Sequence, residues 1–420
     1  MSDPARLTAT AALRQIRAGT LTPADLLEAC LARISADEPR VRAFAHHDAA
    51  AVRAAMPAEG ALHGLPIGVK DVLDTADMPS QYGSPIWAGH TPKADSACVA
   101  WARAAGAVVM GKTVTTEFAT RKPGPTANPH NAAHTPGGSS SGSAAGVAAG
   151  FFPLAFGTQT AGSVIRPAAY CGIVGYKPSY GLVPRLGMKV MSESLDTIGV
   201  MARSVADCAL FAGAVSSHDF GDPDTAPGTT PRIGICPGPA GAEAGPETMA
   251  LLEDATMRLA AAGAAIVPRP LPDAYIALTA AQPLVMNAES ALSMGWELTT
   301  HRDSISEGLL ERLEWGASQG AAALDAARAV MATMQASFGA VMENVDVLLT
   351  PSAQGEAPHG LEWTGDPVFN APWTALHVPC VTIPVGFGPA GLPLGLQIVG
   401  GVGEDRATLA WSQWIASALS

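Results

Sequence analysis

Two neighbouring stretches, TPGGSSSGSAAGVAAG at 135–150 and GTQTAGSVIRPAAYCGIVGYKPSYG at 157–181, carry most of the fold information in this 420-residue chain. The first ends a loop rich in Gly, Pro, Ser and Asn and continues at 143–150 into small residues alone. Such a run predicts a helix that packs very closely on its neighbours. The second stretch places a serine among Gly and Ala, where backbone can approach a ligand closely.

Helical and strand patterns alternate on both sides of these stretches. The periodicity predicts helices over 7–18, 23–35, 40–55, 96–107, 247–262, most of 273–343, and 405–418. Short apolar runs predict strands at 64–72, 107–111, 232–236, 264–268, 345–350, 381–385 and 394–399. Helices that alternate with short buried strands are typical of a layered α/β fold.

Composition excludes several classes of protein. Hydrophobic residues make up 48% of the chain and charged residues 15%, which is well below the usual ~25% and argues against disorder. The net charge of −12 makes nucleic acid and anionic membranes poor partners. The six cysteines show no C-x-x-C spacing, so neither a metal site nor a redox motif is predicted. With no signal peptide or membrane span in the pattern, we expect a cytoplasmic enzyme.

Two short motifs match known patterns but lack the required context. Residues 106–113, GAVVMGKT, fit a phosphate-binding loop, yet the variable positions read as a strand. Residues 138–142, GSSSG, fit the nucleophile elbow of a His-dependent esterase, but no strand precedes them. That esterase stays open as an alternative, because downstream residues could complete a triad: Asp346, Asp366, His359 and His377.

A stronger constellation combines one lysine with two serines. Lys70 lies in GLPIGVKD, Ser139 in TPGGSSSG and Ser163 in TAGSVIRP. A serine hydroxyl is a weak nucleophile and needs a base. Burial beside Ile67 and Val69 would lower the pKa of Lys70 and let it serve as that base. Ser139 could relay the proton, and backbone N–H groups near Ser163 could hold an oxyanion.

With these residues in place, the chain resembles the amidase signature family. The resemblance covers most of the chain and also includes GAVVMGKTVTTEFA, SLDTIGVMARSVADCALF, VDVLLTPSA and FNAPWTALHVPCVTIPVGF. It implies an α/β/α sandwich around one large mixed β-sheet, built as a single domain over 1–420. Residues 60–215 and 345–420 would form the core, and the more variable helices of 232–344 would wall the substrate pocket.

The resemblance further implies a Ser-cisSer-Lys triad. Ser163 would be the nucleophile, Ser139 the bridging serine on a cis peptide bond after Gly138, and Lys70 the base. Ser140 would support the site by hydrogen bonding. The implied oxyanion hole consists of the backbone N–H groups of Thr160, Ala161, Gly162 and Ser163. No metal ion or organic cofactor is implied.

The chain departs from the family pattern at two positions. Where relatives commonly read G-T-D-T-G-G-S-I-R, this chain has Gln159 for the acid and Ile165 for the base, with Arg166 one place later. We infer that the acid and base pair in relatives and that Gln159 forms neutral hydrogen bonds here. This change counts against the alternative interpretation as the glutaminase subunit of a tRNA-dependent amidotransferase. The modest length and the scarcity of basic residues count against it too.

The expected reaction is hydrolysis of the C–N bond of a small neutral amide through an acyl-enzyme. Aryl amides and carbamates, including urethanes, fall within the same expectation. The expected partner is this small molecule alone, and the protein would be a monomer or homodimer. Four tryptophans are candidates for lining the pocket: Trp296, Trp315, Trp363 and Trp373.

Overall fold

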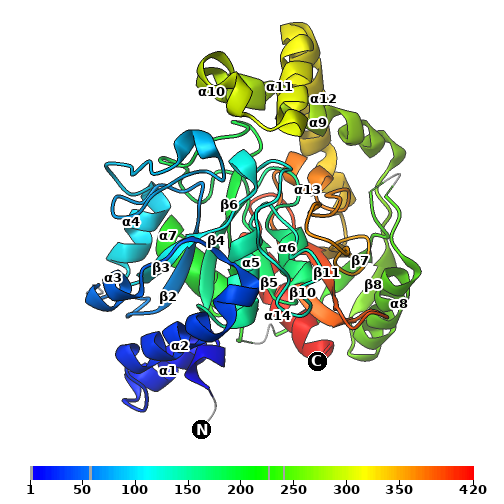
Figure 1. Cartoon of the computed structure of the whole chain (residues 1–420). Coiled ribbons are helices and arrows are strands. Elements are labelled where there is room, and N and C mark those ends of the chain that lie inside the picture. The colour runs from blue at the N-terminus through cyan, green and yellow to red at the C-terminus, as the bar shows by residue number, and fades with distance from the viewer. Residues whose placement is uncertain (1–2, 56–58, 226–227, 240–241) are drawn as a thin grey trace.

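The computed structural model describes residues 3–55, 59–225, 228–239 and 242–420. Within these residues an 11-stranded sheet runs through the molecule in the order β1-β3-β2-β4-β6-β5-β10-β11-β9-β7-β8 (Figure 1). In chain order the strands are β1 Phe44–His46, β2 Pro66–Lys70, β3 Val108–Thr113, β4 Leu154–Gln159, β5 Val174–Lys177, β6 Thr197–Ala202, β7 Arg232–Ile235, β8 Ala265–Pro268, β9 Val347–Pro351, β10 Cys380–Phe387 and β11 Pro393–Val399.

The sheet is mixed. Strands β3, β2 and β4 run parallel to one another, as do β8, β7 and β9. The central pairs from β4 through β6, β5, β10 and β11 to β9 are antiparallel. Most central strands are buried along their whole length, which requires helices on both faces.

The helices are bounded as follows: α1 Ala9–Arg17, α2 Pro23–Val41, α3 Ala49–Ala54, α4 Ala97–Ala104, α5 Ser141–Ala149, α6 Ile165–Tyr170, α7 Val205–Ser216, α8 Pro246–Ala261, α9 Leu278–Ser293, α10 Gly295–Thr300, α11 Glu307–Ser318, α12 Gly320–Val341, α13 Ala371–Ala375 and α14 Asp405–Ala418. Helices α9 to α12 gather at one end of the molecule, at the top of Figure 1.

Two successive residues of β4, Phe156 and Gly157, show which helices cover each face of the sheet. The ring of Phe156 lies 4.5 Å from that of Phe211 in α7. A Cβ atom on the next residue, Gly157, would instead lie 3.0 Å from Ser140 Oγ and 3.2 Å from Val164, beside α5 and α6. Because neighbouring side chains of a strand point to opposite faces, α5 and α6 cover one face and α7 the other. The predicted α/β/α sandwich around one large mixed sheet is confirmed.

The helix predicted over 40–55 is wrong. Helix α2 ends before Arg42, which takes a left-handed conformation with φ 55°, and the chain then enters the edge strand β1 before α3 begins. The Glu38 carboxylate accepts hydrogen bonds from the next two free N–H groups, those of Ala43 and Phe44, at 2.9 Å each. This side-chain cap diverts the chain into the sheet although the apolar periodicity continues.

The phosphate-loop match at 106–113 falls mainly on strand β3, as its apolar residues indicated. Its Lys112 is fully buried and pairs with Asp71 at 3.0 Å, so this lysine is not available to a phosphate. The described part of the chain contains no helix that combines the length and hydropathy needed to cross a membrane.

Candidate active site

Lys70 ends strand β2 inside the protein and is fully buried. Its Nζ lies 2.8 Å from Ser139 Oγ, 2.7 Å from Thr158 Oγ1 and 3.3 Å from the Thr158 carbonyl oxygen. No carboxylate in the described part lies within ion-pair distance of this amine. Burial therefore lowers the pKa of Lys70 well below its usual value, although the charge of Asp196 partly opposes this.

Ser139 is held in place by its surroundings and its own backbone. The Gly138–Ser139 peptide bond is cis, as the family resemblance implies, and the side chain is 1% exposed. Arg166 Nη2 donates a hydrogen bond of 2.7 Å to the Gly138 carbonyl, and Thr116 N donates one of 3.3 Å to the Ser139 carbonyl. Both carbonyls that flank the hydroxyl are thereby fixed, and Ser139 presents its Oγ to Lys70.

Ser163 lies in the turn between β4 and α6, in the wall of a cavity of about 660 Å³ that includes space open to solvent. Its side chain forms no hydrogen bond with another described residue, so its hydroxyl is free to meet a ligand. The structure thus joins Lys70 and Ser139 directly and places Ser163 on the cavity wall. Proton transfer from Ser163 to Ser139 requires a hydrogen bond between their hydroxyl groups, which the structure does not show among its described residues. Such catalytic hydrogen bonds often form only when substrate binds.

The backbone from Thr160 to Ser163 is oriented by its carbonyl groups. The Thr160 carbonyl accepts from Gln282 Nε2 at 3.0 Å, that of Ala161 from Thr374 Oγ1 at 2.7 Å, and that of Gly162 from the α6 backbone at 3.0 Å. None of the four N–H groups in this segment donates to another described residue. Because its carbonyl groups are held by hydrogen bonds and its N–H groups are free among the described residues, this turn can bind an oxyanion.

Gln159 forms neutral hydrogen bonds, as expected from its replacement of an acid. Its Oε1 accepts from the backbone N–H groups of Val164 and Ile165 at 2.9 and 3.0 Å, and its Nε2 donates to Thr374 Oγ1 at 2.9 Å. Thr374 therefore connects Gln159 with the Ala161 carbonyl. Sequence reasoning missed Thr374, which belongs to α13, more than two hundred residues away in the chain.

We expect Thr374→Val to lower kcat about ten-fold, because it removes the hydroxyl that orients the Ala161 peptide and keeps the side-chain shape. Steady-state kinetics on any turned-over amide check this. Thr408→Val in α14 is the matched control, since Thr408 is buried and its hydroxyl donates, among the described residues, only to the carbonyl of Glu404, the residue that caps the same helix. Equal rates for the two variants would contradict the positioning role.

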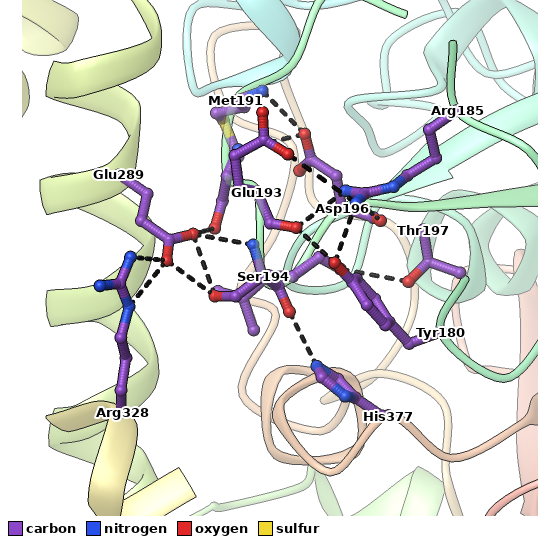
Figure 2. A network of polar contacts seen from close by, with 12 residues as sticks. Tyr180, Arg185, Met191, Glu193, Ser194, Asp196, Thr197, Glu289, Arg328 and His377 are labelled. Carbon is purple, nitrogen blue, oxygen red and sulfur yellow. Dashed lines mark hydrogen bonds and ion pairs between the residues drawn. The ribbon is translucent and has the colours of Figure 1, made fainter. Parts of the chain in front are cut away.

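A polar network connects the segment 191–197 with Glu289 of helix α9 (Figure 2), and Thr160 of the turn donates to Asp196 of that segment. Asp196 accepts from Thr160 Oγ1 at 2.5 Å and from the Met191 backbone N–H at 2.7 Å. Glu289 of α9 accepts from Ser194 at 2.9 Å and from Arg328 at 2.7 Å. Asp196 is thus a structural acceptor, and no sequence motif pointed to Glu289.

The geometry contradicts the His-dependent esterase. Ser140, the central serine of GSSSG, is fully buried, and its Oγ donates to the Thr158 carbonyl at 3.3 Å. His377 instead contacts the Ser194 carbonyl, and Asp346 pairs with Arg232. Among the described residues, none of the four proposed triad partners bonds with Ser140: Asp346, Asp366, His359 and His377.

Of the four tryptophans considered for the pocket, only Trp363 is found in the wall of this cavity. Trp373 is wholly buried and packs against Phe338. Trp296 is 48% exposed and packs on Trp87, and Trp315 is 44% exposed. The other wall residues come mostly from the turn 160–163, from the segment 119–121, and from α9 and α11. In the described part, His, Cys, Asp and Glu form no cluster of three or more that could hold a metal ion.

The chain is similar to known proteins over most of its length. A family model described as Amidase matches residues 25–409. A glutamyl-tRNA(Gln) amidotransferase subunit from Chloroflexus aggregans is 36% identical, over 97% of this chain and 95% of that protein. Among solved structures, a crystal structure of an amidase has a TM-score of 0.88 at 28% identity and covers 99% of this chain and 100% of the other. The peptide amidase of Stenotrophomonas maltophilia has a TM-score of 0.80 at 28% identity, with 98% and 96% covered.

Proposed function

This chain belongs to the amidase signature family, and on that premise we propose that it is a serine hydrolase that cleaves the C–N bond of a small amide. The observation that carries the proposal is the contact of 2.8 Å between Lys70 Nζ and Ser139 Oγ. A fully buried amine without a carboxylate partner loses its proton readily, and here it meets a hydroxyl rather than solvent.

The proposed reaction has two steps. Neutral Lys70 takes a proton from Ser139, which takes one from Ser163, while Ser163 Oγ forms a bond to the substrate carbonyl carbon. The free N–H groups of 160–163 stabilise the resulting oxyanion. The C–N bond then breaks as the proton returns along the same path to the leaving nitrogen. Water attacks the acyl-enzyme by the same relay and releases the acid and Ser163.

The substrate class follows from a panel of five compounds assayed with the purified protein alone. The panel consists of an aliphatic amide, an anilide, an aryl carbamate, an ester and glutamine, with amine, ammonia or alcohol release as the readout. Release from an amide or carbamate supports a stand-alone amidase and ranks aryl amides and urethanes against aliphatic amides. No turnover of any compound by a protein with a reactive Ser163 points to a missing partner.

A second candidate is the glutaminase subunit of a tRNA-dependent amidotransferase. The similarity to the Chloroflexus aggregans protein favours it, and the chain covers 95% of that relative, so its length is no argument against this function. Gln159 in place of the usual acid and the net charge of −12 remain the points against it. Activity confined to glutamine, or dependent on added partner subunits, would favour this candidate over the first.

The lowered pKa of Lys70 predicts a distinctive pH profile. Below that pKa the lysine is an ammonium and cannot accept a proton, so kcat/KM should rise about tenfold per pH unit on the acid limb and then level off. The measurement is kcat/KM from pH 5 to pH 10 on one uncharged substrate. A maximum near pH 5 with loss of activity at alkaline pH would contradict a lysine base.

A further inference from the structure

The cavity beside Ser163 is lined by three arginines, although the protein as a whole has a net charge of −12. Arg121 comes from the segment after β3, Arg166 from α6 and Arg312 from α11. The described residues that line this cavity include no Asp or Glu. The wall that faces the reacting serine therefore carries three positive charges.

These guanidinium groups lack the partners that most arginines of this chain have. In the described part, none of the three is within ion-pair distance of a carboxylate. Arg166 is 4% exposed, and while its Nε and Nη2 hold the Thr364 and Gly138 carbonyls, its Nη1 is buried without any hydrogen-bond partner. A buried donor left unpaired is costly, so an anionic acceptor at this place would satisfy it.

The arginines are also close enough to repel one another. Burial and, to a smaller extent, the charge of Arg121 together lower the pKa of Arg312 to about 10. Burial also lowers the pKa of Arg166 to about 10, and Arg121 acts in the same direction. Arg166 and Arg312 therefore remain protonated at neutral pH. Two acidic groups lie close to this wall. Asp366 lines an adjoining cavity together with Arg121 and Arg312, and Asp196 lies behind the wall, where it accepts from Thr160 Oγ1 and from the Met191 backbone N–H. In the described part neither carboxylate forms an ion pair with any of the three arginines.

We propose that the substrate is an amide that also carries a carboxylate, and that Arg121 and Arg312 bind this carboxylate while Ser163 attacks the amide carbonyl. This inference rests on the proposed function and narrows its substrate class from the neutral amide expected at first to an anionic one. Guanidinium groups suit the task because their planar donors match both carboxylate oxygens. Arg166 already donates to the Gly138 carbonyl through Nη2, so in the described part only its Nη1 is free to donate to the substrate carboxylate.

The test is protection of Ser163 against a neutral covalent reagent, phenylmethanesulfonyl fluoride. Ser163 Oγ would form a bond to sulfur, fluoride would leave, and the proton would pass to Lys70; intact-protein and peptide mass spectrometry follow the rate. Carboxylates of two to six carbons, mono- and dibasic, are compared as protectants with their neutral primary amides. We expect at least one carboxylate to slow labelling about ten-fold at a concentration where its amide has no effect.

The variants Arg312→Met and Arg121→Met should each weaken that protection about ten-fold, since each removes one charged partner. Arg258→Met on α8 is the matched control: it removes the same charge from a helix outside the cavity, where Arg258 faces Asp254. Its protection should stay within two-fold of the parent protein. Added salt should weaken the protection given by the carboxylate, whereas any protection given by an amide at higher concentration should not change with salt.

The possible outcomes separate the two proposals. If Ser163 is labelled but no carboxylate protects better than its amide, or if Arg312→Met and Arg258→Met behave alike, the anionic substrate is refuted and the serine hydrolase stands. If Ser163 is not labelled at all while other residues are, the proposed function fails. If glutamine, a zwitterion, protects as well as the best carboxylate, the glutaminase candidate gains and the carboxylate site stands.

Discussion

Replacing Ser163 by alanine should reduce amide hydrolysis by on the order of 10⁴-fold or more, because the change removes the atom that forms the acyl-enzyme. Initial rates of amine or ammonia release measure the loss, on whichever panel compound the parent protein turns over. The Ser163 hydroxyl has no hydrogen bond to another described residue, and alanine removes only this hydroxyl. We therefore expect KM and the thermal midpoint of Ser163→Ala to stay close to those of the parent.

Ser140→Ala is the control that separates the two serines of the loop. Its hydroxyl donates to the Thr158 carbonyl at 3.3 Å and does not line the cavity, so its loss should reduce the rate by about ten-fold or less through positioning. A Ser163→Ala protein with the parent's rate, or a Ser140→Ala protein that is the more severely impaired, would show that the nucleophile is assigned to the wrong serine.

Replacing Lys70 by methionine should lower kcat by on the order of 10³-fold, the usual scale for loss of a general base. Methionine keeps much of the side-chain volume inside the strand layer, so the fold should persist. The neutral amine is needed in both steps, and kcat and kcat/KM should fall together. The residual rate should also lose the rise toward alkaline pH, a change that a purely structural lysine would not cause.

Lys177→Met is the matched control for that experiment. Lys177 is also a fully buried lysine at the end of a strand, and its Nζ forms a hydrogen bond of 2.9 Å with the Pro178 carbonyl and with no other described residue. Its replacement should leave the rate per folded molecule and the pH profile unchanged. If Lys70→Met retains the alkaline rise, or if the Lys177 variant loses as much activity, then Lys70 is not the base.

The sequence alone was sufficient for the features that depend on local pattern and on family motifs. The apolar residues around Lys70 predicted its burial, and the replacement of an acid by Gln159 predicted neutral hydrogen bonds, which the structure shows. Most strands and helices were found near their predicted places, because each has a clear apolar period. The same reasoning failed at 40–55, where the Glu38 side chain stops the helix.

The charged cavity could not be predicted in this way. Arg121 follows a strand and Arg312 lies on a helix nearly two hundred residues later, and each reads as an ordinary solvated cation in its own segment. They meet only in the folded chain, where the segment 119–121 and helix α11 line the same cavity as the turn 160–163. The prediction for Trp373 was wrong for the converse reason. A tryptophan is a common pocket residue, but α13 places this one in the core, where it is fully buried.

The central claim is that Ser163 carries the acyl group. The most direct measurement is mass spectrometry of the protein quenched during turnover of an activated ester, followed by peptide mapping. The account predicts one added acyl group, located on the peptide that contains Ser163, absent in Ser163→Ala and formed far more slowly in Lys70→Met. An acyl group on Ser140 or Cys171, or equal acylation of the Ser163→Ala protein, would contradict it.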